Sequence, residues 1–271
     1  MHYGLEIVPF GQFADPRLVI QFAQAAEAAG WEGLVVWDHV TFPYGNGDPW
    51  VLLSAAAAVT EKLKLVTGVA ALPRYRPHLL ARLITSLDTL SQGRVILGAG
   101  LGAIDEEFTA FGDPGEKKVR AGMLDEGLQV LTQLWSGEAV TYHGQHYTVE
   151  NACLAHTPLQ KPRPPIWIGG DSPPALRRAA NWDGWLGGTC DEHCNTITQP
   201  EQVAHIAATL GKYRTSPEPF ELALQGVTDP GQADKILPYR QAGATWWFES
   251  IFPLRGSLEA MMARIQAGPA K

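Results

Sequence analysis

The chain has 271 residues, and its 21 lysines and arginines stand against 28 aspartates and glutamates, which gives a formal net charge of −7. A composition with 45% hydrophobic and 18% charged residues argues against a disordered chain, and an acidic balance without a basic block disfavours nucleic acid or a membrane as a partner. Three cysteines, an odd number, fit a reduced compartment better than a disulfide framework. No run of residues predicts a signal peptide or a membrane span, so we expect a cytoplasmic protein.

Strand and helix patterns alternate from the N-terminus onward. Short apolar runs, typical of strands buried on both faces, occur at residues 3–8, 33–37, 63–71, 94–98, 166–168, 183–186, 220–227 and 244–251. A helical pattern follows each run, and several begin with a start signal such as Asp15-Pro16 or Asp48-Pro49. The expected helices cover residues 16–30, 48–62, 77–93, 116–135, 173–182, 201–214, 232–242 and 257–266.

A different pattern interrupts this alternation after the fourth helix. Residues 139–149 alternate β-prone side chains around Gly144, which predicts a β-hairpin. Eight strand–helix units in a chain of this length favour a closed (β/α)8 TIM barrel over an open, doubly wound α/β sheet. We therefore predict a single barrel domain over residues 1–271, with the hairpin inserted after the fourth helix.

In such barrels the active site lies in the loops that follow the carboxyl ends of the strands. Asp38-His39 follows the second predicted strand. A histidine there can transfer a proton near neutral pH, and an adjoining carboxylate can orient it, so we take His39 and Asp38 as candidate catalytic residues. The alternative is that Asp38 caps the loop and His39 packs beneath it.

Two glycine-rich segments follow the fourth and fifth strands. Gly169-Gly170-Asp171-Ser172 precedes a helix start, where N–H groups and the Ser172 hydroxyl suit a phosphate. A plain helix cap is the alternative, and Asp171 would repel an anion. Residues 98–102 contain G-x-G-x-G but lack the helix spacing of a dinucleotide-binding motif, so we interpret them as a flat wall for a planar ring.

Two further clusters have less specific patterns. Arg74-Tyr75-Arg76 follows the third strand and either clamps an anion or forms a solvated turn. Residues 190–194 contain two cysteines and a histidine, but no second pair stands at ligand spacing. We therefore expect no metal site and interpret this stretch as a solvated loop.

Five segments in this order resemble the luciferase-like monooxygenase superfamily, whose members are flavin- or deazaflavin-dependent (β/α) barrels. The resemblance runs over most of the chain and rests on EAAGWEGLVVWDH, LVTGVAALPRYRPHLLARLITSLDTLSQGRVILGAGLG, DEEFTAFG, LDEGLQVLTQLWSGEAVTYHGQHYTV and PPIWIGGDSPPALRRAANWDGW. The order and spacing of the segments are more specific than any one of them.

The resemblance implies that a flavin ring lies across the mouth of the barrel. His39 then has the position of a catalytic or substrate-facing histidine, with Asp38 beside it. Behind the ring the family often has a bulge, sometimes with a cis peptide bond, at the positions of Gly68, Val69 and Ala70. The other implied contacts are those of the ring and ribityl chain with Ala99, Gly100, Leu101, Gly102 and Ala103, and those of the phosphate with Gly170, Asp171 and Ser172.

The chain departs from the family's pattern near the phosphate. Some relatives have an arginine in the strand-four glycine stretch as a phosphate partner, where this chain has Leu101, and many have a tryptophan where it has Ala103-Ile104. The positive partner of the phosphate is therefore open, with Arg74 and Arg177 as the alternatives.

The resemblance implies an oxidoreductase with FMN or the deazaflavin coenzyme F420. Reduced FMN with molecular oxygen supports monooxygenation of a small organic substrate, and a separate flavin reductase would supply the reduced FMN. The deazaflavin supports hydride transfer without oxygen insertion. We expect the FMN monooxygenase, with the deazaflavin enzyme and a non-catalytic flavin-binding subunit as alternatives. A metal-dependent hydrolase is disfavoured, because only the second strand ends in a carboxylate–histidine pair. By family likeness we expect a homodimer.

Overall fold

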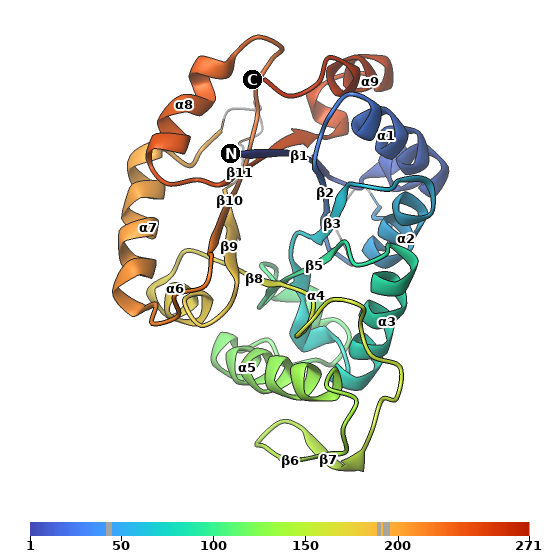
Figure 1. Ribbon diagram of the computed structural model, residues 1–271, viewed down its shortest axis with the longest axis vertical. Helices are drawn as coiled ribbons and strands as arrows, with labels where there is room; N and C mark the ends of the chain where they lie inside the picture. Colours follow the sequence, from blue (N-terminus) through green and yellow to red (C-terminus); the bar gives the residue numbers. More distant parts are fainter. Residues whose placement is uncertain (42–44, 189–190, 192–195, 271) are drawn as a thin grey trace.

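The computed structural model describes residues 1–41, 45–188, 191 and 196–270. Its parallel strands close into a barrel in the order β3-β2-β1-β11-β10-β9-β8-β5, and the pairing of β3 with β5 completes the circle (Figure 1). The barrel strands are β1 (His2–Ile7), β2 (Gly33–Val36), β3 (Lys64–Thr67), β5 (Val95–Gly100), β8 (Ile166–Gly169), β9 (Gly184–Gly187), β10 (Glu221–Gly226) and β11 (Trp246–Ile251). The predicted (β/α)8 barrel is confirmed.

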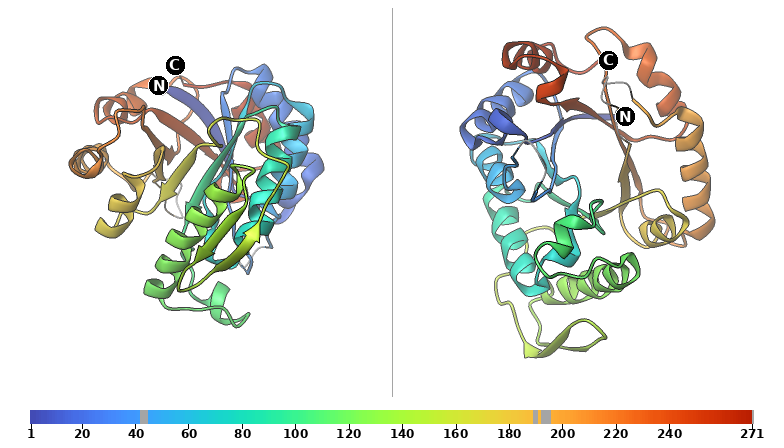
Figure 2. Two further views of the ribbon diagram at one scale, coloured as in Figure 1. Left: turned by 60° about the horizontal axis from the view of Figure 1, so that its bottom comes forward. Right: turned by 180° about the vertical axis from the view of Figure 1, so that it is seen from behind.

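Helices surround the barrel on its outside, as two further views show (Figure 2). They are α1 (Pro16–Ala28), α2 (Pro49–Val59), α3 (Pro77–Leu90), α5 (Lys117–Leu134), α6 (Pro173–Ala179), α7 (Pro200–Tyr213), α8 (Ala233–Gln241) and α9 (Leu258–Gln266). Asp15 and Asp48 cap α1 and α2, because their carboxylates accept the N–H groups of Arg17 and Val51. Both start signals identified in the sequence are therefore confirmed.

Alternate residues of each strand point into the barrel or outward to the helices. The inward side chains form one cluster, made of Val35, Val66, Ile96, Trp167, Leu186, Ala223, Trp246 and Phe248. Trp246 belongs to this inner cluster, whereas the adjacent Trp247 packs in the outer core between sheet and helices. Gly4 leaves room for the inner aromatic rings, since a Cβ there would lie 2.3 Å from Phe248. The barrel interior is thus a packed layer that supports the strand ends.

The third barrel strand is interrupted, in contrast to the continuous run predicted at residues 63–71. β3 ends at Thr67, the peptide bond between Gly68 and Val69 is cis, and pairing resumes with β5 at β4 (Ala70–Ala71). The bulge with a cis peptide bond that the family resemblance implies at this position is confirmed.

The predicted hairpin consists of β6 (Val140–His143) and β7 (Thr148–Ala152), which pair antiparallel. In Figure 1 it projects beyond α5, away from the ring of strands. Glu126 of α5 accepts the N–H groups of Gln145, His146 and Tyr147 in the hairpin turn, so the turn is fastened to the fourth barrel helix.

Short helices that the sequence patterns did not predict lie in the connecting loops. They are η1 (Gly11–Ala14), η2 (Leu72–Arg74), α4 (Glu106–Thr109) and η3 (Pro253–Arg255). Among the residues that the structure describes, no helix is both long and apolar enough to cross a membrane.

Candidate functional site

A cavity of about 530 Å³ opens at the carboxyl ends of the barrel strands. This volume lies in the range of small-molecule sites. Its described lining comprises Trp37, Asp38, His39, Gly68, Val69, Gly100, Leu101, Gly102, Ala103, Lys117, Gly169, Gly170, Asp171, Ser172, Ala175 and Gln225. Most of the residues expected to catalyse or to hold a cofactor therefore share one cavity.

A larger cavity, of about 1190 Å³, lies around Lys64, Trp167 and Trp246 at the opposite end of the barrel. Charged groups on its wall are partly paired with each other, as in the 2.5 Å ion pair between Arg163 and Asp183. Because active sites of (β/α)8 barrels lie at the carboxyl ends of the strands, we assign the chemistry to the smaller cavity.

Glycines form one wall of the smaller cavity. A Cβ at Gly100, which is part of the cavity lining, would lie 2.6 Å from Val69 Cγ2. A Cβ at Gly169 would come within 3.0 Å of the same valine. Side chains are thus excluded from β5 and the end of β8 around Val69, which leaves a smooth surface where a planar ring can approach the backbone.

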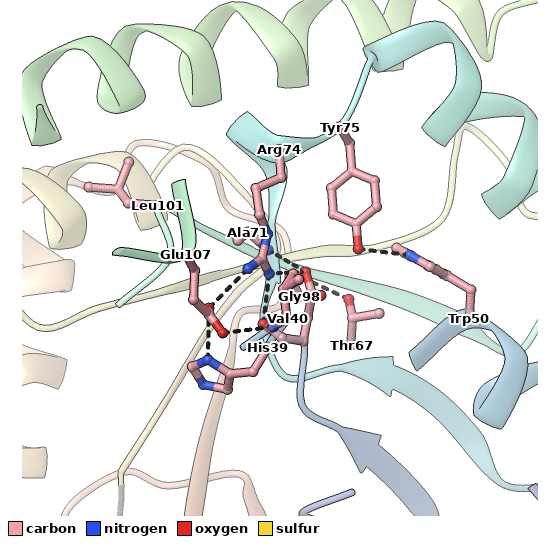
Figure 3. A network of polar contacts seen from close by, with 12 residues as sticks. His39, Val40, Trp50, Thr67, Ala71, Arg74, Tyr75, Gly98, Leu101 and Glu107 are labelled. Atoms are coloured by element: carbon pink, nitrogen blue, oxygen red, sulfur yellow. Dashed lines mark hydrogen bonds and ion pairs between the residues drawn. The ribbon is translucent and has the colours of Figure 1, made fainter. Parts of the chain in front are cut away.

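Glu107, in α4, connects the loop after β2 to the cavity wall (Figure 3). Its side chain is 1% exposed, and its Oε1 accepts the N–H groups of Val40 and Thr41 at 2.7 and 2.9 Å. Its Oε2 lies 3.0 Å from His39 Nδ1 and 3.0 Å from a guanidinium nitrogen of Arg74. Glu107 therefore holds both the loop and the imidazole of His39 in place.

The carboxylate of Glu107 is ionised near neutral pH. Burial raises its pKa, but the N–H groups of Thr41 and Val40 and the His39 ring lower it by more, so its pKa lies below the ordinary value of 4.5. An ionised carboxylate accepts hydrogen bonds only, so Nδ1 of His39 is the donor of this pair. The imidazole is thereby fixed in one orientation at the cavity.

Asp38 turns away from His39. Its carboxylate accepts the N–H of Ala71 at 2.8 Å and pairs with Arg74 at 2.9 Å, while its backbone carbonyl accepts a further Arg74 bond at 2.8 Å. The prediction that the adjoining carboxylate orients His39 is therefore wrong, because the N–H of Ala71 and the guanidinium of Arg74 engage the Asp38 carboxylate. Glu107 orients His39, and Asp38 joins the loops after β2 and β3.

Tyr75 lies behind this network, away from the cavity lining. Burial and the Asp38 charge raise the pKa of Tyr75 well above its ordinary value. Its hydroxyl therefore stays neutral and accepts the indole N–H of Trp50 at 3.1 Å (Figure 3).

A polar cluster inside the barrel is joined to the cavity lining through Trp37. Trp37 lines the cavity and donates its indole N–H to Glu6, which also accepts the hydroxyl of Ser250. Burial raises the pKa of Glu6 to about 7, although both hydrogen bonds lower it.

Gln225, which is 7% exposed, also lines the cavity, and its amide nitrogen is buried without a hydrogen-bond partner in the described structure. Such an amide suits a ligand with polar ring atoms.

Three of the predicted cofactor residues are not part of the described cavity lining. Ala70 and Ala99 are fully buried in the core between strands and helices. The side chain of Arg74 is 8% exposed and engaged by two carboxylates, so it organises the loops and does not face the cavity. The cysteine–histidine cluster at residues 190–194 lies, apart from Asp191, outside the described residues.

The site, meaning the cavity lining and the side chains that hold it, also contains residues that the sequence reasoning missed. Trp37 and Gln225 carried a usable signal, because alternation along β2 and β10 predicts that they face inward. Glu107 carried none, because it lies 68 residues from His39 in a helix of four residues. Lys117 stands at the start of α5, where a lysine usually faces solvent.

The described residues fit a phosphorylated flavin or deazaflavin. The glycine wall offers a flat surface for the ring, and the unpartnered amide of Gln225 offers a donor to its polar edge. Gly170 and Ser172 offer backbone N–H groups, and Lys117 a positive charge, to an anionic side chain.

A protein-family model described as luciferase-like monooxygenase matches residues 6–228 of the chain. The chain belongs to this family. An uncharacterised protein from Mycobacterium tuberculosis is 32% identical over 257 residues, which cover 83% of this chain and 86% of the relative. A relative from Microbacterium testaceum, the F420-dependent glucose-6-phosphate dehydrogenase, is 34% identical over 172 residues, covering 60% of this chain and 50% of that protein.

The fold of this luciferase-like protein is also similar to that of solved structures. The monooxygenase RslO1 from Streptomyces bottropensis superposes with a TM-score of 0.80 at 21% identity, covering 98% of this chain and 97% of that chain. At this identity the similarity shows the shared barrel alone.

Proposed function

We propose that this luciferase-like protein is an F420-dependent oxidoreductase that transfers hydride between the deazaflavin and a small alcohol or its carbonyl counterpart. The observation that carries the proposal is the 3.0 Å contact between His39 Nδ1 and Glu107 Oε2, which holds the imidazole of the cavity-lining His39 in place. When hydride leaves or reaches a carbon that bears oxygen, a proton must leave or reach that oxygen, and a fixed imidazole can carry it.

The chain's own residues position the reactants and move the proton. When bound, the cofactor supplies the hydride chemistry. Val69 and the glycines of β5 would hold the ring, and Gln225 would donate a hydrogen bond to it. His39 exchanges a proton with the substrate oxygen through Nε2, and Glu107 stabilises the positive imidazole while the proton is held.

The named relatives and the family support different cofactors. The relative named for F420 and glucose-6-phosphate supports the deazaflavin, although the aligned region covers only half of its length. The match to a family described as monooxygenases supports the second candidate, oxygen insertion with reduced FMN. The reductase that FMN would require, and a homodimeric assembly, are proposals that rest on family likeness alone.

The proposal is tested by turnover of His39→Gln beside wild type. Under anaerobic conditions, F420 is offered with a panel of alcohols, and reduced F420 with the matching aldehydes and ketones, while the absorbance of the oxidised deazaflavin is followed. His39→Gln should lower kcat by about 10²-fold and change cofactor affinity by less than about twofold. His78→Gln, on the exposed side of α3, is the matched control and should keep full activity.

The alternatives give different results. Turnover of His39→Gln within about threefold of wild type would remove the proton-transfer role. Oxygenated product from chemically reduced FMN and oxygen, with F420 inert, would replace the proposal by the second candidate. Cofactor binding without turnover in either assay would indicate a non-catalytic flavin-binding subunit.

A further inference from the structure

Among the described residues that line the candidate cavity, Lys117 is the one that is either a lysine or an arginine. It is the first residue of α5 and shares the cavity wall with residues 169–172, the segment expected to lie at the phosphate. We propose that the Lys117 ammonium group is the positive partner of the cofactor's ribityl phosphate. This inference rests on the proposed function, because it requires a phosphorylated ring in the cavity.

The other cationic side chains near this part of the barrel are already engaged. The guanidinium of Arg74 pairs with Asp38 and Glu107. Arg120 is fully buried and pairs with Asp105. These two arginines hold loops together and have no geometry for reaching an anion in the cavity.

The two arginines of α6 also point elsewhere. Arg178 binds Asp125 through two nitrogens, at 2.5 and 2.9 Å. Arg177, one of the two alternatives that the sequence left open, has its guanidinium carbon 6.0 Å from the centre of the Tyr213 ring and is not part of the described lining. The side chain of Lys117, in contrast, makes no hydrogen bond or ion pair with the described part of the chain.

A phosphate bound at this cavity wall would need a positive group beside it. Asp171 lies on the same wall and would repel a phosphate if no positive group balanced it. Beyond the N–H groups of Gly170 and Ser172, the first two residues of α6 add no backbone donor, because Pro173 and Pro174 have no N–H. Lys117 is exposed, so its long side chain can reach a bound phosphate without losing a structural partner.

The test compares ligands with and without the phosphate. Wild type, Lys117→Gln and Lys118→Gln are titrated with FMN and with riboflavin, and likewise with F420 and its phosphate-free deazaflavin core, by the change in ring fluorescence. Lys118 is an exposed neighbour on α5 outside the described lining and serves as the matched control. Thermal unfolding of each variant checks that the fold is unchanged.

We expect Lys117→Gln to weaken the phosphorylated ligands by about tenfold and the phosphate-free ones by less than twofold. Lys118→Gln should match wild type, Lys117→Arg should keep most of the affinity, and added salt should reduce the difference between Lys117→Gln and wild type. Equal affinities of Lys117→Gln and wild type for the phosphorylated ligands would overturn the inference and leave the proposed function standing. An equal loss for both kinds of ligand would also overturn it. Wild type that binds neither FMN nor F420 would overturn both.

Discussion

Replacing Glu107 by glutamine should both destabilise the protein and release the loop that carries His39. The carboxylate makes four contacts of 2.7 to 3.0 Å, to two backbone N–H groups, to Arg74 and to His39. Glutamine keeps one acceptor oxygen and turns an amide NH2 toward partners that are themselves donors. Two charge-assisted contacts are lost in a buried site, so the free energy of unfolding should fall by about 3–5 kcal/mol.

The loss is measured by urea unfolding followed by fluorescence of the nine tryptophans. Glu106→Gln, one residue away and exposed, is the control and should stay within about 0.5 kcal/mol of wild type. Because the pKa of Glu107 is lowered in the folded protein, its contribution is present above the ordinary value of 4.5 and is lost as the pH falls through the folded pKa. The difference in the free energy of unfolding between wild type and Glu107→Gln should therefore become smaller in acid. A Glu107→Gln variant as stable as the control would refute this role.

Three further changes test other parts of the structure. Glu6→Gln removes a carboxyl group whose pKa is raised to about 7 in the folded protein, so this group lowers the stability of wild type as the pH rises from about 4.5 to about 7. Over that range the free energy of unfolding of the variant, measured in urea, should rise relative to that of wild type by up to about 3 kcal/mol. Parallel plots of unfolding free energy against pH for the two proteins would contradict this. Gly100→Ala places a Cβ 2.6 Å from Val69, and should weaken FMN and riboflavin equally in the fluorescence titration; unchanged affinity would show that the ring does not use this wall. Arg94→Lys removes the guanidinium group, which donates hydrogen bonds to the backbone carbonyls of Ala57, Thr60, Leu63 and Ser91. The free energy of unfolding should fall by about 3 kcal/mol, and an unchanged melting temperature would contradict this role of the guanidinium.

The barrel could be predicted because its signals are local. Buried parallel strands leave continuous apolar runs, and Asp15-Pro16 and Asp48-Pro49 mark helix starts without any knowledge of the rest of the chain. The position of His39 at the cavity could also be predicted, because active sites of (β/α)8 barrels lie in the loops at the carboxyl ends of the strands.

The side-chain contacts of the site could not be predicted, because they join residues that are distant in the sequence. Asp38 stands next to His39 in the chain yet bonds Ala71 and Arg74, whereas Glu107 reaches His39 from 68 residues away. The backbone conformation sets the direction in which a side chain points, so the adjacency of Asp38 and His39 in the sequence misled the assignment of Asp38 as the residue that orients His39.

The central claim is that the mouth of the barrel binds a phosphorylated flavin or deazaflavin ring. Anaerobic titration of the purified protein with F420 and with FMN, each oxidised and reduced, tests it most directly. We predict saturable binding of at least one of them, with about one ligand per chain and a dissociation constant below about 100 μM. No saturable binding of any of the four forms would contradict the claim.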